Sequence, residues 1–182
     1  MVDEPASEMI LEQEGGAAEA AAAVAERFPG TATSVSYGQQ VVFVDRAVWR
    51  DLALFLRDEQ RFTSCMDITA VDQLHRPQRA LPAGVAPERF EVVANFLSHH
   101  RNLRLRAICQ VPEGAPVPSL YDAFPGVELP EREVFDLLGV VFDGHPELVR
   151  LLMPDDWVGH PLRKDDAPAR VPVQFKGDPG PE

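Results

Sequence analysis

The sequence predicts an α+β domain in which helices cover one face of a mixed or mainly antiparallel sheet, followed by an extended, Pro-rich C-terminal tail. Candidate elements follow one another as a helix, two strands, a helix, three strands and short helices. An apolar fraction of 45% in 182 residues is enough for one hydrophobic core. We therefore expect an acidic, disordered segment 1–16, a globular domain 17–153 and a tail 154–182.

The first half of the domain is predicted to contain two helices and one β-hairpin. Pro29 and Gly30 end an alanine-rich helix. Gly38 separates two strand candidates, as in a hairpin, and Asp45 is a suitable N-cap for the second helix. The expected elements are a helix over 17–28, strands over 31–37 and 39–44, and a helix over 46–58.

The second half is predicted to complete the sheet. Apolar and polar residues alternate over 103–111, which is the pattern of a half-buried strand. A segment rich in Pro, Gly and Arg over 74–87 indicates a surface loop. The other expected elements are strands over 62–71 and 90–97 and a short helix over 118–124.

A short, strongly charged helix is predicted over 131–138. Pro130 suits a helix start, because the N–H that it lacks is not needed in the first turn. The carboxylates of Glu131 and Glu133 favour the positive end of the helix dipole. Gly139 is a natural C-terminal stop.

Ion pairing and a second helical stretch are expected around this helix. Arg132 and Asp136 are four residues apart, so they could pair along one helix face and contribute roughly a few tenths of a kcal/mol. One or two further helical turns are expected over 147–153, ended by Pro154, with a turn at 155–157.

The tripeptide Gly-His-Pro occurs twice, at 144–146 and at 159–161. In each copy the glycine permits a sharp turn and the proline favours an extended conformation for the histidine. The combination of dense charge with this doubled motif favours a surface that another protein binds. Six prolines from Pro154 onward exclude regular helix or central strand in the tail. Its spaced apolar residues are typical of a segment that lies along a partner, the alternative being a terminus without a partner.

A larger set of residues follows these motifs in order. The set comprises Glu131, Arg132, Glu133, Phe135, Asp136, Gly139, Gly144, His145, Pro146, Arg150, Pro154, Asp155, Asp156, Trp157, Gly159, His160, Pro161, Arg163, Lys164 and Asp165. In this order and spacing the residues resemble the signature of the C-type subunit of respiratory NADH:quinone oxidoreductase, the 30-kDa subunit family of complex I. The match covers about the last third of the chain, with a looser pattern from about residue 17. The chain departs from the family pattern at 128–130, where an aromatic residue is usual, and at 166–168, where Tyr-Pro is usual.

The resemblance implies a non-catalytic structural subunit in the peripheral arm of a proton-pumping respiratory translocase. It implies a location on the cytoplasmic face of a prokaryotic plasma membrane without direct membrane insertion. The partners it implies are the large, hydrogenase-like subunit of D type near the quinone site, along which the tail would pack, and other peripheral-arm subunits. FMN and iron–sulfur clusters would belong to partner subunits, with no cofactor in this chain. The alternative is the homologous subunit of a membrane-bound hydrogenase or of a quinone oxidoreductase with another electron donor.

Composition argues against several other functions. The formal net charge of −12 disfavours binding to nucleic acid or to anionic lipid. A small basic patch of Arg101, Arg104 and Arg106 remains, for which a solvated strand face is the simpler interpretation. No apolar run approaches the ~18–20 residues that span a bilayer. Cys65 and Cys109 are expected to be reduced, and two thiolates are too few for the usual iron–sulfur ligation.

No catalytic, cofactor-binding or metal-binding residues are predicted in this chain. The adjacent His99 and His100 would face opposite ways on a strand. His145 and His160 have no cysteine or third histidine nearby in the sequence, so turn or interface roles are favoured over zinc. Glu131 would make structural salt bridges or interface contacts, as would Glu133. Neither a phosphate-binding Gly-rich loop nor a nucleophile elbow is present.

Overall fold

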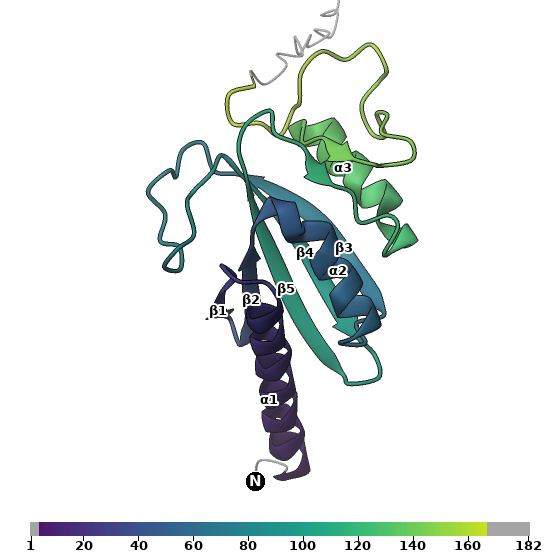
Figure 1. Cartoon of the computed structure of the whole chain (residues 1–182). Helices are drawn as coiled ribbons and strands as arrows, with labels where there is room; N and C mark the ends of the chain where they lie inside the picture. Colours follow the sequence, from purple (N-terminus) through teal and green to yellow (C-terminus); the bar gives the residue numbers. More distant parts are fainter. Residues whose placement is uncertain (1–3, 167–182) are drawn as a thin grey trace, which may run out of the picture.

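The computed structural model describes residues 4–166, and their side chains from residue 15 onward. The tail residues 167–182 of the predicted C-terminal segment therefore lie outside the described part. The elements in chain order are α1 (Glu4–Arg27), β1 (Ala32–Ser36), β2 (Gln39–Val44), η1 (Arg46–Val48), α2 (Trp49–Asp58), β3 (Ser64–Asp72), β4 (Phe90–Ser98), β5 (Leu103–Val111), β6 (Val117–Pro118), η2 (Pro125–Val127), α3 (Glu128–Leu138) and β7 (Phe142–Asp143) (Figure 1). This confirms the predicted α+β class.

The main sheet has five strands in the order β1-β2-β5-β4-β3. The β2–β5 pair is parallel and the other three pairs are antiparallel, so the sheet is mixed. The predicted hairpin is confirmed, with Ser36 opposite Gln39 and Gly38 at a positive φ of 75° in the turn. Asp45 caps the next helical segment as expected, because its carboxylate accepts the Ala47 N–H at 2.7 Å.

One hydrophobic core lies on one face of this sheet. It contains buried residues of α1, α2 and α3 together with every second residue of β4 and β5. Successive strand residues point to opposite faces, so these alternate positions place the core on a single side. The strand residues concerned are Phe90, Val92, Ala94, Phe96, Leu103, Leu105, Ala107, Cys109 and Val111.

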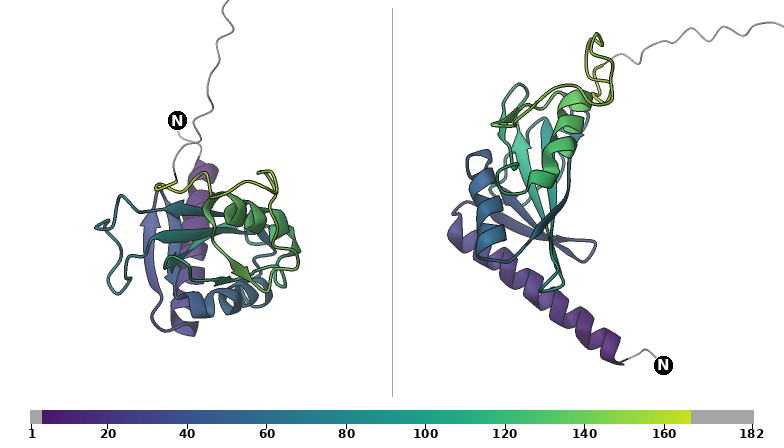
Figure 2. Two further views of the ribbon diagram at one scale, coloured as in Figure 1. Left: turned by 90° about the horizontal axis from the view of Figure 1, so that it is seen from above. Right: turned by 90° about the vertical axis from the view of Figure 1, so that its right-hand side faces the viewer.

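The opposite face is covered only in part. The predicted loop between β3 and β4 carries Arg79, which donates to Glu91 at 2.7 Å and to Gln110 at 2.5 Å near the start of β4 and the end of β5. Farther along, Asp67 and Thr69 of β3 are exposed on this face. The views in Figure 2 also show α1 projecting beyond the sheet at its N-terminal end.

Helix α1 begins at Glu4, whereas the expected helix began at residue 17. Residues 4–16, predicted to be disordered from their acidic composition, are therefore helical. Most of them are Glu, Gln, Ala, Leu or Met, which are strong helix formers. The consecutive Gly15 and Gly16 lower helix propensity without ending the helix.

Two other predicted helical stretches are absent. Residues 118–124 form a single turn, in which the Phe124 N–H donates to Leu120 O at 2.8 Å. The preceding Ser119 N–H is used by Asp143 O at 2.8 Å in the pairing of β6 with β7, so it is not available to a helix. The segment 147–153 is likewise irregular. Its backbone groups bond to side chains of α3, as described below.

Candidate interaction site

Asp136 organises the segment that follows α3. Its carboxylate is fully buried. Oδ2 accepts the backbone N–H groups of Leu151, Leu152 and Met153 at 3.0, 2.7 and 2.8 Å, and Oδ1 accepts Arg150 Nη1 at 2.6 Å. Burial alone would raise the pKa of Asp136, but these donors outweigh it and lower the pKa to about 2. Three N–H groups committed to one carboxylate cannot form helical turns, which explains the irregular backbone here.

The predicted pair between Arg132 and Asp136 does not form. Arg132 instead donates to the carbonyl oxygens of Val149 at 3.2 Å and Arg150 at 3.1 Å, and its nearest carboxylate is Glu147 at 3.8 Å. Spacing of four residues brings side chains close only when no better partners compete. Here a tertiary segment supplies backbone partners to both residues, so each binds the 147–153 stretch rather than the other.

Arg150 joins two parts of the C-terminal segment. Besides Asp136, its Nη2 donates to the carbonyl oxygens of Trp157 at 2.8 Å and Gly159 at 3.1 Å. The predicted turn at 155–157 is confirmed, since the Trp157 N–H donates to Pro154 O at 3.0 Å. The chain from Arg150 to Gly159 is thus held as a loop by one guanidinium, and the side chains at 154–156 on it are exposed.

Gly139 ends α3 as predicted and permits a close approach that no other residue would allow. It adopts a left-handed conformation with φ of 72°, and its N–H donates to Phe135 O at 2.9 Å. A Cβ at this position would lie 2.6 Å from both the His160 ring and Arg163 Nη2. The glycine therefore lets the second Gly-His-Pro segment lie directly on the helix end.

The remaining carbonyl groups at the C-terminal end of α3 are met by that same segment. Helix ends leave such groups without partners, and cations are favourable there. The donors and acceptors are His160 Nδ1 to Asp136 O at 2.9 Å, the Leu162 N–H to Leu137 O at 3.0 Å, and Arg163 Nε to Leu138 O at 2.7 Å. The second motif is thus a helix cap built from a distant part of the chain.

The first Gly-His-Pro segment lies at the other end of the same helix. His145 Nε2 donates to Glu128 O at 3.0 Å, and its Nδ1 accepts the Glu147 N–H at 3.0 Å. This pair of bonds defines the neutral tautomer with the proton on Nε2. Because the two histidines hold opposite ends of α3, they do not converge on one point.

Glu131 has a role that the sequence did not reveal. It is fully buried, and its carboxyl group accepts the Ser119 hydroxyl at 2.5 Å and the Leu120 N–H at 2.7 Å. Among the described side chains it makes no salt bridge, contrary to expectation, whereas Glu133 is exposed. Burial raises the pKa of Glu131 to about 7, opposed by the two hydrogen bonds.

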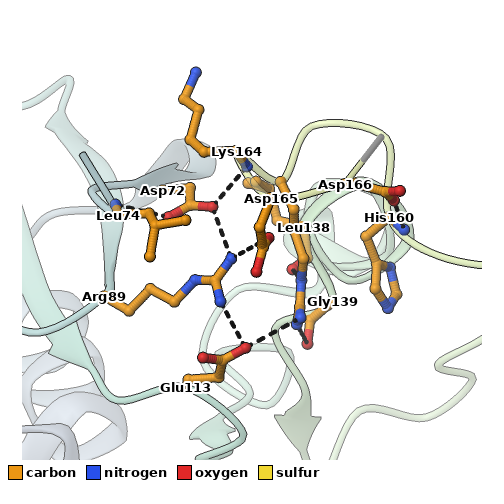
Figure 3. Close-up of polar contacts among 11 residues, drawn as sticks. Asp72, Leu74, Arg89, Glu113, Leu138, Gly139, His160, Lys164, Asp165 and Asp166 are labelled. Carbon is orange, nitrogen blue, oxygen red and sulfur yellow. Dashed lines mark hydrogen bonds and ion pairs between the residues drawn. The ribbon is translucent and has the colours of Figure 1, made fainter. Parts of the chain in front are cut away.

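A second cluster that the sequence did not reveal surrounds Arg89, and we call it the Arg89 cluster (Figure 3). Arg89 Nη2 donates to Asp72 at 3.1 Å and also contacts Asp165, while Nη1 donates to Glu113 at 2.6 Å. The Lys164 N–H donates to Asp72 Oδ2 at 2.9 Å. The motif residues Lys164 and Asp165 are thus fastened to the start of β4 and the end of β3.

Charge in the Arg89 cluster is balanced by close contact. Burial opposes ionisation of Asp72, but the Lys164 N–H, Arg89 and the Leu74 N–H together lower its pKa. The Asp165 contact is the main reason that the pKa of Arg89 is raised. Arg89 and Arg163 also lie over the Phe90 ring, with guanidinium carbons 5.1 and 5.4 Å from its centroid.

Five apolar side chains of this segment face solvent although their backbone is firmly held. We call them the C-terminal apolar residues: Val149, Leu151, Leu152, Val158 and Leu162, which are 48, 36, 59, 92 and 54% exposed. Exposed apolar residues gathered in one segment typically mark a protein interaction site. The buried polar contacts described above therefore present these side chains for binding.

Other kinds of site were sought in the same described residues. Between residues 4 and 166 no group of three or more His, Cys, Asp or Glu residues could hold a metal ion. No helix in that range has the length and apolar character to cross a bilayer. Cys65 and Cys109 are free thiols, and burial raises the pKa of each to about 12.

Comparison with known proteins identifies the family. A family model described as the 30 Kd subunit of respiratory-chain NADH dehydrogenase matches residues 42–171. The chain belongs to this family. The resemblance predicted from the motif residues is therefore confirmed.

Several members of the 30 Kd subunit family are similar in sequence and structure. The C-type NADH-quinone oxidoreductase subunit of Mycobacterium avium (strain 104) is 42% identical, covering 74% of this chain and 54% of the relative. The protein of the same name from Rhodopseudomonas palustris (strain BisB18) is 45% identical, covering 72% and 62%. A solved trypsin-resistant fragment of Nqo5 has a TM-score of 0.59 at 28% identity, covering 72% of this chain and 95% of the fragment. This chain thus spans just over half the length of the first of these relatives.

Proposed function

We propose that this chain is a non-catalytic structural subunit in the peripheral arm of a proton-pumping NADH:quinone oxidoreductase. Family membership supports the assignment to that complex. The presentation of the C-terminal apolar residues on a backbone anchored by Asp136 is the observation that supports a structural role. Such residues gain free energy only when a partner covers them, roughly 1.5–3 kcal/mol for each large side chain that becomes fully buried.

The partner in this proposal is the large, hydrogenase-like subunit of D type, near its quinone site. Segment 154–182 would run along that subunit, starting from the loop that Arg150 and the Arg89 cluster hold in place. The present chain would then keep its partner in fixed geometry while electrons leave the cluster chain for quinone. FMN and iron–sulfur clusters would reside in other subunits, and the whole arm would lie at the cytoplasmic face of a prokaryotic plasma membrane.

The proposal is tested by assembly in the source organism. A tagged chain is extracted from membranes with mild detergent and separated on a native gel stained for NADH oxidation. We expect a large NADH-active band that contains the large subunit. A large band active with hydrogen would assign the chain to a hydrogenase instead, and recovery only as a free monomer would contradict a structural role in either complex.

A matched pair of variants tests the docking residues themselves. Leu152→Asp introduces charge among the C-terminal apolar residues, and Val35→Asp does so at a similarly exposed position on β1, 63% exposed against 59%. We expect L152D to leave the isolated chain folded but reduce its share in the large band at least tenfold. V35D is expected to assemble normally, and equal assembly of the two variants would contradict this docking surface.

A further inference from the structure

A groove of about 620 Å³ lies on the sheet face opposite the main core. It crosses β2, β5, β4 and β3 near the β4–β5 turn, whereas the Arg89 cluster lies at the other end of β4 (Figure 1). Four strands correspond to three spacings, or roughly 14 Å of width. The side chains that line it and matter here are Tyr37, Gln39, Met66, Asn95, Arg104 and Arg106.

The floor of this groove carries two arginines without a carboxylate partner. Arg106 donates to Asn95 Oδ1 at 3.2 Å and to Gln39 Oε1 at 2.8 Å, which are both neutral amides. Arg104 is exposed and lies two residues along the same strand face. Within the part of the chain whose side chains are described, neither arginine forms a salt bridge. In a chain of net charge −12 this is a local positive site.

The opposite wall of the groove carries a negative charge. Asp67 of β3 also lines it and is exposed. Asp67 pairs with Asn95, and Asn95 pairs with Arg106, so the three residues form one row across the sheet. Two strand spacings separate the positive end from the negative end, which is roughly 10 Å. An extended chain advances this distance in about three residues.

The rim adds two apolar side chains that are open to contact. Tyr37 is fully exposed and has a positive φ of 51°, next to Gly38 with φ of 75° in the hairpin turn. Asn, Asp or Gly would fit that conformation with less strain than tyrosine. Met66 on the β3 side is 56% exposed. Tyrosine, methionine and arginine are the residue types enriched in protein interfaces.

We propose that this groove binds an extended segment of a neighbouring subunit that carries an acidic residue and, three positions away, a lysine or arginine. The acidic side chain lies over Arg104 and Arg106, and the basic side chain lies over Asp67. The segment crosses the strands, with its apolar parts against Tyr37 and Met66. This inference rests on the proposed function in one respect, since the neighbour is another subunit of the same assembly.

Photo-crosslinking in the assembled complex tests the occupant directly. The probe p-benzoylphenylalanine is placed at Tyr37 in one preparation and at Leu152 in another, and mass spectrometry identifies the crosslinked peptides. We expect the Tyr37 probe to capture a segment with the acidic and basic residues spaced as proposed. If only the Leu152 probe captures a subunit, the groove proposal is wrong and the proposed function stands. If neither probe captures one, both are wrong.

A charge reversal with rescue supplies the second test. Arg104→Glu is expected to reduce the chain's share in the native complex at least tenfold. Arg76→Glu, at an exposed position on the β3–β4 loop, is expected to have no effect. Changing the captured acidic residue of the partner to lysine is expected to restore assembly of R104E. Normal assembly of R104E, or failure of the rescue while R104E is folded, would overturn the proposal.

Discussion

His145 and His160 bond to opposite ends of α3, the first at the Glu128 carbonyl and the second at the Asp136 carbonyl. Each belongs to one copy of Gly-His-Pro, so the doubled motif fixes one helix from both sides. The distances of 3.0 and 2.9 Å are those of ordinary hydrogen bonds from a neutral imidazole. The repeated motif thus has a structural explanation that involves neither metal binding nor catalysis.

Removing the Asp136 carboxylate is expected to destabilise the chain strongly. Asp136→Ala leaves three backbone N–H groups and Arg150 without their shared acceptor, which should reduce the free energy of unfolding by about 3–5 kcal/mol. Urea unfolding of the isolated chain measures the effect. Asp156→Ala, at an exposed position, is the control and should change it by less than about 0.5 kcal/mol.

Stability is expected to fall with rising pH because of Glu131. The folded chain keeps its proton up to about pH 7, whereas an unfolded glutamate releases it near pH 4.5. The neutral carboxyl therefore contributes fully below about pH 4.5, and up to about 3 kcal/mol is lost as pH rises to 7. Glu131→Gln should flatten the unfolding free energy measured over this range. The exposed Glu133→Gln should leave the slope unchanged, and an unchanged slope in E131Q would contradict the assignment.

Gly139→Ala is expected to displace the second Gly-His-Pro segment. The left-handed backbone alone costs a non-glycine residue roughly 1–3 kcal/mol, and the new Cβ would also meet the His160 ring. Thermal unfolding measures the loss. Amide exchange should increase at Leu162, whose N–H bonds to the helix end. Gly126→Ala is the matched control, because nothing lies within 4 Å of its Cβ position.

Arg89 is expected to matter far more than an exposed arginine in an ion pair. Arg89→Ala leaves the buried Asp72 without its guanidinium partner, so we expect a loss of about 3–5 kcal/mol and faster amide exchange at Lys164. Arg50→Ala removes an exposed pair with Asp122 and should cost at most about 1 kcal/mol. Equal losses from the two variants would show that the Arg89 cluster does not hold the segment.

Much of the fold follows from local sequence signals. The hairpin around Gly38, the capping role of Asp45 and the stop at Gly139 were predicted because each depends on one residue's own conformational preference. The alternation over 103–111 likewise predicted which side chains of β5 are buried. These features need no knowledge of distant partners.

The site was predicted in its residues but not in its contacts. Glu131 has the sequence appearance of an exposed first-turn carboxylate, and only the fold brings Ser119 to it. Arg89 meets Asp165 across 76 positions, a separation over which no periodic pattern acts. Helical turns over 147–153 were expected from local composition, whereas Asp136 draws those N–H groups away from a helix. Tertiary hydrogen bonds outweighed local preference in each case.

The capping of α3 by residues 160–163 also orders events during protein synthesis. The carbonyl groups at the end of this helix acquire their partners only after Arg163 has emerged from the ribosome. The parallel pairing of β2 with β5, by contrast, can form once residue 109 has emerged. A nascent chain therefore completes its sheet before its binding surface, and a product that terminates early lacks that surface.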